Sequence, residues 1–387
     1  MKVVIAFDKF KGTLSATEAC HIAAAYFSAR GMQVVEKPMA DGGEGTAESL
    51  LAANAGTWIP VDVTGPLPAM RVRAGFAWFP ATHTALIEMA TASGLALLKP
   101  EQRNPLATTT RGTGELIDAA MRHGASSILL AIGGSATNDG GIGAAIALGW
   151  RFFDAQDNEL APVGASLIKI VRLAPPPPRL LPPVEVLCDV TNPLFGPQGA
   201  AAVFGPQKGA TPHMVAELDA GLRNLAGVIA RSLGQNVDSL PGGGAAGGLG
   251  AGAVAFMSAR LISGITAVMQ ACRLEDAIRT ADYVITGEGA LDRQSLMGKV
   301  LSGVLKLAQR HGVRVAVIAG RIDLTEHELR VAGISHALAL IDGATSAETA
   351  MSNARAMFAV RAKTLAEILS PNTPALQHSI TPGGFQP

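Results

Sequence analysis

The chain has 387 residues, of which 48% are hydrophobic and 16% charged, and its 31 basic and 31 acidic residues give a formal net charge of zero. This length allows two domains with a large core, and the apolar content excludes a disordered chain. The zero net charge gives no indication of a nucleic acid or an anionic membrane surface as a partner.

Cysteine spacing and the N-terminus indicate where such a protein works. Cys20, Cys188 and Cys272 are far apart and odd in number, so they make neither a disulfide framework nor a zinc site. The first residues, MKVVIAFDKFKG, are too short and too charged for a signal peptide, and no apolar run is long enough to span a bilayer. We therefore expect a cytoplasmic protein without a membrane partner.

The first 56 residues show strands that end in polar turns. Residues 3–7 are a continuous apolar run that predicts a buried strand, and Asp8 follows it. Ser15 and Glu18 have the spacing of a capping box that opens a helix. A second strand over 32–37 leads into ADGGEGT, which contains Asp41, and then into a helix. Because ligands bind at the carboxyl ends of strands in open α/β sheets, both turns are candidate binding segments.

The sequence pattern changes at residue 57. Three stretches from there on predict antiparallel strands: TWIPVDVTG, MRVRAGFAWF and TALIEMA. A polar loop over 103–114 with Arg111 precedes a helix that ends near residue 123. The stretch AIGGSATNDGGIG, residues 131–143, then joins a predicted strand to a small-residue helix. A Gly-rich turn before a helix N-terminus brings backbone N–H groups to an anion, although a tight turn with polar caps has the same pattern.

Three further segments carry chemistry. A strand over 184–190 contains Asp189 near its end, and the loop GPQKG contains Lys208. PGGGAAGGLGAG, residues 241–252, formally fits G-x-G-x-x-G, but no strand precedes it, so a close backbone approach to a phosphate or to another helix is favoured over a dinucleotide site. The turn after a strand over 283–286 holds Glu288 and leads to Asp292.

Regular alternation of strands and helices at the start, near residue 125 and at the end predicts one parallel sheet. We expect an α/β protein with a discontinuous Rossmann-like domain, residues 1–56 with 100–138 and 275–369. Residues 57–99 with 139–274 would form an inserted α+β domain, and residues 370–387 a flexible C-terminal tail. The last helix is expected to start at Thr345, with Glu348 in its capping box, and to reach residue 369. An active-site cleft between the two domains would collect the acidic and Gly-rich turns.

Phosphoryl transfer needs positioning, neutralisation of phosphate charge, a metal ion and often a carboxylate near the attacking hydroxyl. The strand-end turns supply carboxylates and cations of this kind, although each one alone is also typical of a turn or a solvated surface. There is no Walker motif, because Gly298 and Lys299 are followed by Val300. The histidines lack the H-E-x-x-H and H-x-x-E-H spacings of zinc hydrolases.

Taken together, these blocks resemble the bacterial glycerate kinase family over nearly the whole chain, from residue 1 to about residue 369. The matching blocks follow the order of that family: AFDKFKGTLSATEA, ADGGEGT, TTRGTGELI, GGSATNDGGIGAA, CDVTNPLFGPQGAA, VFGPQKGA, GGGAAGGLGAG and ADYVITGEGALDRQSLMGK. The resemblance implies ATP-dependent phosphorylation of D-glycerate, most often to 2-phosphoglycerate, with a Rossmann-like domain and a second α/β domain. Mg²⁺ would accompany ATP, and a homodimer is compatible with the family.

Roles follow from this resemblance as hypotheses. Asp189 is the first candidate for the base near the attacking hydroxyl and Asp41 the second, with Lys11 in the same catalytic group. D-Glycerate would lie among Asp8, Arg111, Ser135 and Asn138. Lys208 and Lys299 would neutralise the ATP phosphates, and a backbone cradle would come from Gly243, Gly244, Gly247 and Gly248. Glu288 and Asp292 would hold Mg²⁺ or water on the phosphate side.

Two other classes of protein stay open. A sugar-acid or nucleotide binding module without catalysis would not need several carboxylates close together, because like charges destabilise a site that has no metal ion or chemistry to use them. A nicotinamide dehydrogenase would need G-x-G-x-x-G after the first strand, where this chain has DKFKG.

Overall fold

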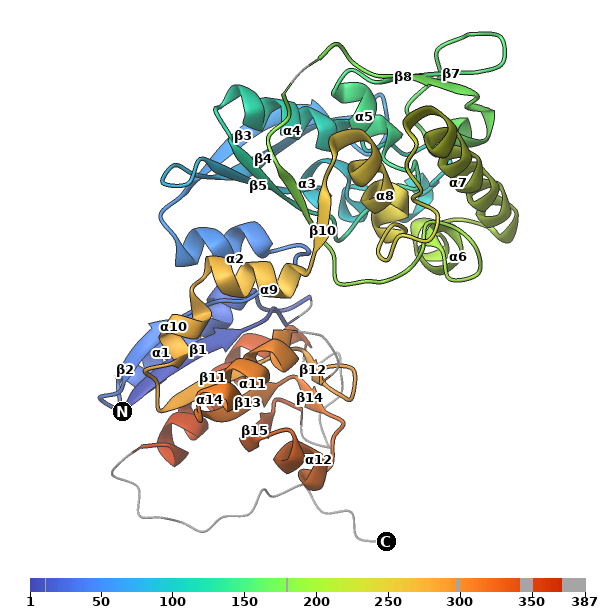
Figure 1. Cartoon of the computed structure of the whole chain (residues 1–387). Coiled ribbons are helices and arrows are strands. Elements are labelled where there is room, and N and C mark those ends of the chain that lie inside the picture. The colour runs from blue at the N-terminus through green and yellow to red at the C-terminus, as the bar shows by residue number, and fades with distance from the viewer. Residues whose placement is uncertain (11, 179, 297–299, 342–350, 371–387) are drawn as a thin grey trace, which may run out of the picture. The chain divides into compact units, whose positions relative to one another are not determined.

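The computed structural model describes residues 1–10, 12–178, 180–296, 300–341 and 351–370. Contacts divide the chain into two compact units. Unit 1 comprises Met1–Asp41, Glu48–Asn54 and Ile265–Pro387, and unit 2 comprises Gly42–Ala47 and Ala55–Gly264. Both contain helices and a sheet (Figure 1), so the expected α/β class is confirmed.

Unit 1 contains a five-stranded sheet in which every strand pair is parallel, in the order β15-β13-β11-β1-β2. The strands are β1 (Lys2–Phe7), β2 (Gln33–Glu36), β11 (Tyr283–Gly287), β13 (Arg314–Ala319) and β15 (Ile334–Ala339). A two-stranded ladder pairs β12 (Ala290–Leu291) with β14 (Arg321–Ile322). Residues 3–7 are fully buried, as expected of a parallel strand covered on both faces.

The helices of unit 1 are α1 (Ala16–Ser28), α10 (Leu274–Ile278), α11 (Val300–Arg310), α12 (Glu326–Val331) and α14 (Ala354–Ile368). Two of them, α1 and α12, start at a residue whose side chain caps the helix. The chain passes between the units within α2 (Thr46–Ala53) and α9 (Gly264–Ala271). The capping box predicted at Ser15 is confirmed, and Thr325 with Glu328 forms a second one at the start of α12. Phe358 of α14 packs edge-on against Phe7, with ring centroids 5.1 Å apart.

Unit 2 contains a six-stranded mixed sheet in the order β10-β9-β6-β5-β4-β3. The strands are β3 (Thr57–Thr64), β4 (Arg71–Phe79), β5 (Thr84–Glu88), β6 (Ser127–Ala131), β9 (Val184–Leu187) and β10 (Arg260–Ile262). The predicted antiparallel arrangement of β3, β4 and β5 is confirmed, and β5, β6, β9 and β10 run parallel. A separate antiparallel pair joins β7 (Arg151–Phe153) to β8 (Arg172–Ala174).

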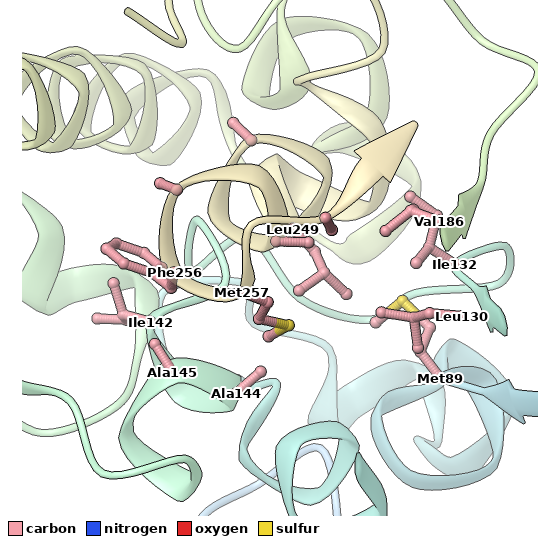
Figure 2. Close-up of a cluster of buried hydrophobic side chains, with 14 of the residues drawn as sticks. Met89, Leu130, Ile132, Ile142, Ala144, Ala145, Val186, Leu249, Phe256 and Met257 are labelled. Carbon is pink, nitrogen blue, oxygen red and sulfur yellow. The ribbon is translucent and has the colours of Figure 1, made fainter. Parts of the chain in front are cut away.

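The helices of unit 2 surround a large apolar core. They are α3 (Ala90–Ser93), α4 (Arg111–Arg122), α5 (Ile142–Ala147), α6 (Ala200–Phe204), α7 (Pro212–Leu233) and α8 (Ala245–Met257). Figure 2 shows Leu249, Phe256 and Met257 of α8 in one apolar cluster with Ile142 and Ala145 of α5. The core therefore fixes α8 against the Gly-rich turn from which α5 starts.

One prediction about the sheets is wrong. We expected residues 100–138 to share a sheet with the first strand, but β6 pairs with β5 and β9, and residues 100–138 belong to unit 2. A short apolar strand is compatible with either parallel sheet, because its sequence reports burial and not its partner. The division into a Rossmann-like domain and an inserted domain, and the active-site cleft, stay predictions.

Some predictions concern segments that the structure does not describe. The expected helix start at Thr345 and nearly all of the expected tail lie outside the described residues. Among the helices that are described, none is long and apolar enough to cross a membrane.

Candidate active site

The carboxyl edge of the parallel sheet in unit 1 gathers acidic side chains. Phe7 of β1 and Gly287 of β11 are paired in register, so Asp8 and Glu288 follow neighbouring strands at the same edge. The Asp8 N–H donates to the Gly287 carbonyl at 3.0 Å. Lys9 lies beside them, with its Nζ 3.6 Å from Oδ1 of Asp41. The predicted turns after these strands are therefore brought together within one unit.

Asp8 has the most perturbed carboxyl group of this edge. Its residue is only 8% exposed, and Oδ1 accepts a 2.7 Å hydrogen bond from the Lys9 N–H. Burial, together with the nearby carboxylates of Asp41 and Glu288, raises the pKa of Asp8 to about 7 against the opposing effect of Lys9. Near neutral pH this carboxyl group therefore binds a proton far more readily than an exposed aspartate does.

Asp292 forms its own turn a few residues after β11. Its Oδ1 accepts hydrogen bonds from the backbone N–H of Ser295 at 2.9 Å and from the Ser295 hydroxyl at 3.2 Å. The described residues contain no group of three or more His, Cys, Asp or Glu side chains arranged to hold a metal ion. Mg²⁺ is often held by only one or two carboxylates together with substrate phosphates, so Glu288 and Asp292 fit a metal ion that binds with a nucleotide.

In unit 2, Asp139 holds the Gly-rich turn together from inside. Its Oδ2 accepts hydrogen bonds from the N–H and the hydroxyl of Thr110, both at 2.8 Å, and from the Gly143 N–H at 3.2 Å. Its Oδ1 accepts from the Gly141 N–H at 3.0 Å. Asp139 is fully buried, and burial raises its pKa. This carboxylate therefore fixes the shape of the turn.

Lys208 lies beneath the same turn. It ends a short 3₁₀ helix, Pro206–Lys208, and only 2% of its surface is exposed. Its Nζ donates to Oγ of Ser135 and to the carbonyl of Thr137, both at 2.7 Å. Burial lowers the pKa of Lys208 to about 7, while the Asp139 carboxylate acts in the opposite direction. The structure thus joins Lys208, predicted for ATP, to Ser135, predicted for the substrate.

Asn138, which follows directly, has an unusual side chain. The residue is fully buried, and neither its Oδ1 nor its Nδ2 has a hydrogen-bond partner among the described residues. The hydroxyl oxygen of Thr137 is also buried and has no hydrogen-bond partner among the described residues. A buried polar group without a partner costs about 1–3 kcal/mol, so such groups indicate a ligand or an ordered water.

The Gly-rich segment that opens α8 has a packing role. Gly247 has φ +69°, and a Cβ on it would lie 2.0 Å from the Thr137 carbonyl oxygen. A Cβ on Gly248 would lie 2.9 Å from the Cα of Gly140. The N–H groups of Gly243, Gly244 and Gly248 donate to carbonyl groups of the chain itself. The geometry therefore supports close backbone contact, and the phosphate cradle stays a prediction.

The remaining predicted residues lie in different surroundings. Asp189 is exposed after β9, and its Oδ1 accepts a 2.8 Å hydrogen bond from Ser263, which follows the neighbouring strand β10. Arg111 begins α4 with an exposed side chain 3.2 Å from Glu115. Lys11 and Lys299 lie outside the described residues.

Sequence reasoning missed two polar residues at the sheet edge of unit 2. Ser263 is one of them, and Glu88 is the other. Glu88 ends the buried strand β5, and its Oε1 accepts a 2.7 Å hydrogen bond from the Ala47 N–H. A glutamate directly after an apolar strand, as in TALIE, was the available signal.

A parallel sheet with carboxylates at its strand ends, together with a hydrogen-bonded Gly-rich turn, is the arrangement expected of an α/β enzyme that acts on a small anionic substrate, as small-molecule kinases do. Comparison with known proteins supports this class. The model of the glycerate kinase family matches residues 3–370. The chain therefore belongs to the glycerate kinase family, and it is an enzyme that phosphorylates glycerate.

Individual relatives agree with this assignment. A glycerate kinase of Bacillus subtilis is 44% identical over 359 residues, which cover 92% of this chain and 94% of the relative. A protein of Escherichia coli named glycerate 2-kinase is 47% identical and covers 83% of this chain and 86% of the relative. The crystal structure of a putative glycerate kinase 2 from Salmonella typhimurium has a TM-score of 0.82 at 44% identity, covering 95% of this chain and 97% of that one.

Proposed function

We propose that the enzyme transfers the γ-phosphoryl group of ATP to the 2-hydroxyl of D-glycerate and releases 2-phosphoglycerate and ADP. The name of the Escherichia coli relative, glycerate 2-kinase, supports this position on the acceptor. In the reaction the hydroxyl oxygen forms a bond to the γ-phosphorus, the bond from that phosphorus to the β-phosphate oxygen breaks, and the hydroxyl proton passes to a base.

The observation that carries the substrate assignment is the buried side chain of Asn138. A small hydroxy acid offers both hydroxyl donors and carboxylate acceptors, and the amide of Asn138 has one acceptor and two donors that the described protein leaves unused. Ser135, three residues earlier, adds a hydroxyl on the same turn. We assign Arg111 a secondary role in attracting the substrate carboxylate, because its side chain is exposed and its positive charge is already paired with Glu115.

Asp189 is our first candidate for the base, and Asp41 is the second. Asp189 is exposed at a strand end, and its hydrogen bond from Ser263 orients the carboxylate. A positioned general base contributes typically about 10²- to 10⁴-fold to the rate. We place Lys11 in the same catalytic group on the strength of the family resemblance.

Glu288 and Asp292 are proposed to hold Mg²⁺ on the phosphate side, where the metal ion would neutralise phosphate charge. Asp8, as a buried carboxyl group between Asp41 and Glu288, would favour the approach of that cation. Lys299 is proposed to neutralise a phosphate. Assembly as a homodimer stays a prediction for sedimentation analysis.

The test is a coupled ADP-release assay with Mg²⁺, ATP and D-glycerate, followed by ³¹P NMR of the product. ADP release with a 2-phosphoglycerate signal is the expected result. A 3-phosphoglycerate signal would overturn the assignment of the hydroxyl, and glycerate binding without ADP release would favour a binding protein. L-Glycerate serves as the control for stereochemistry.

A further inference from the structure

The burial and the hydrogen bonds of Lys208 are not explained by the roles proposed above. Its ammonium group is almost completely buried and makes two short hydrogen bonds, one to Ser135 and one to the Thr137 carbonyl. We propose that Lys208 is a positioning residue, which orients the Ser135 hydroxyl toward the glycerate carboxylate and locks the carbonyl of Thr137. This inference rests on the proposed function, in which Ser135 contacts the substrate.

The direction of the first hydrogen bond follows from chemistry. In its charged form a lysine has three N–H donors and no acceptor, so in the 2.7 Å contact the ammonium group donates and Ser135 Oγ accepts. The single hydrogen of the Ser135 hydroxyl is then free to donate to another group. An anionic acceptor such as a carboxylate oxygen suits a donor of this kind, because hydrogen bonds to ionised groups are the stronger ones. Lys208 therefore makes Ser135 a donor toward a ligand.

The second hydrogen bond fixes the backbone of the turn. The Thr137 carbonyl that accepts from Lys208 also lies against Gly247, where a Cβ would come within 2.0 Å of its oxygen. Held by the ammonium group and confined by Gly247, this peptide has little freedom to rotate. Asn138 is the next residue, so its amide is presented from a rigid backbone.

The burial of Lys208 argues against direct contact with ATP. A side chain that is 2% exposed and already donates to two groups of its own turn has little surface to offer to a phosphate chain. Burying a cation also lowers the stability of the folded state, and an apolar residue of similar volume would fill the space without this desolvation penalty. The lysine at this position therefore acts on the shape and the polarity of the turn.

The experiment compares Lys208→Met, Ser135→Ala and the double variant with the wild-type enzyme, measuring KM for D-glycerate, KM for ATP and kcat. Met keeps the length and apolar body of the side chain and removes the donors. We expect Lys208→Met to raise KM for glycerate at least about tenfold and to leave KM for ATP within about twofold. In the Ser135→Ala background the same substitution should add less than about threefold, because one variant already removes what the other acts through.

Three results would overturn the inference. A rise in KM for ATP would show a phosphate contact, unchanged KM values would show a packing role, and multiplying effects of the two substitutions would show independent action. If wild-type enzyme does not phosphorylate glycerate at all, the proposed function fails, and this outcome is distinct from the other three.

A second pair of variants keeps the inference testable if Lys208→Met does not fold. Ser135→Thr retains the hydroxyl and should keep KM for glycerate within about threefold, whereas Ser135→Ala should raise it about tenfold. Equal KM values for these two variants would overturn the role of the Ser135 hydroxyl.

Discussion

At the scale of single residues, two buried ionisable groups have pKa values that burial moves to about 7 from opposite sides, Asp8 upward and Lys208 downward. Both are perturbed mainly by the loss of water and lie in the segments proposed to bind ligand. Groups with strongly perturbed pKa values cluster at functional sites, where residues are arranged for chemistry at a cost in stability.

Asp8→Asn should stabilise the protein while lowering its activity. Because the pKa of Asp8 is raised from 3.8 to about 7 in the folded state, the folded protein holds a proton there that the unfolded chain has released. The carboxylate therefore lowers stability progressively as pH rises from about 4 to 7, and the full cost applies above pH 7. At pH 8 the variant should gain about 1–4 kcal/mol in the free energy of unfolding, and the gain should vanish near pH 4.

Thermal and urea unfolding of the two proteins at pH 4, 6 and 8 would measure this gain. Asp62→Asn is the control, because Asp62 is exposed and pairs with Arg73 at the surface, where an ion pair contributes about 0–1 kcal/mol. A variant at Asp8 that is no more stable than wild type at pH 8 would contradict the prediction.

Asp189→Asn should lower kcat by about 10²- to 10⁴-fold if Asp189 is the base. The substitution keeps the size of the side chain and an acceptor for Ser263, so the loss would report the charge and the basicity. Ser263→Ala, which removes the hydroxyl that donates the 2.8 Å hydrogen bond, should reduce kcat less than about tenfold. Turnover of Asp189→Asn within about tenfold of wild type would move the assignment to Asp41.

At the scale of elements, the start of α8 shows how glycine allows two backbones to meet. Ala246, Gly247 and Gly248 all have positive φ, and Gly247 and Gly248 pack against residues 137–140 of the Gly-rich turn. The rigidity of that turn therefore depends on a segment about 100 residues further along the chain.

Gly247→Ala and Gly234→Ala form a matched pair for testing this contact. Both glycines have nearly the same positive φ, +69° and +67°, but a Cβ at position 234 would meet nothing within 4 Å. Gly234→Ala should therefore cost about 1 kcal/mol for backbone strain alone. Gly247→Ala should cost at least about 3 kcal/mol, because the Cβ would also overlap the Thr137 carbonyl.

Denaturant unfolding of both variants would give the two costs. Equal costs would show that the turn moves aside easily. In that case the glycine at position 247 would be explained by its backbone conformation and not by packing.

At the scale of the whole molecule, the chain forms one unit, leaves it after Asp41, and returns to it for good at Ile265. The all-parallel sheet of unit 1 is thus built from the two ends of the sequence, with β1 between β2 and β11. Carboxylates from residues 8, 41 and 288 come together only because these distant strands are neighbours.

Removal of divalent metal should abolish turnover of the whole enzyme. With excess EDTA, ADP release should fall at least about 100-fold, and added Mg²⁺ should restore it, since the proposed metal ion supplies the positive charge that neutralises the phosphates. Steady-state assays across Mg²⁺ concentrations would measure this, with Ca²⁺ as a comparison ion. Full activity in EDTA would contradict the proposal that Glu288 and Asp292 hold a metal ion.

The sequence by itself determined the class of the protein, its family and most of its helices and strands. These features are local: apolar runs report burial, capping boxes such as Ser15 with Glu18 fix helix starts, and family blocks keep their residue types in order. The partner of β6, the burial of Lys208 under Ser135 and the contact of Gly247 with Thr137 were decided only by the tertiary structure. Each depends on which distant segments pack together, and a lysine or a glycine has the same local signature in a solvated loop as in a buried contact.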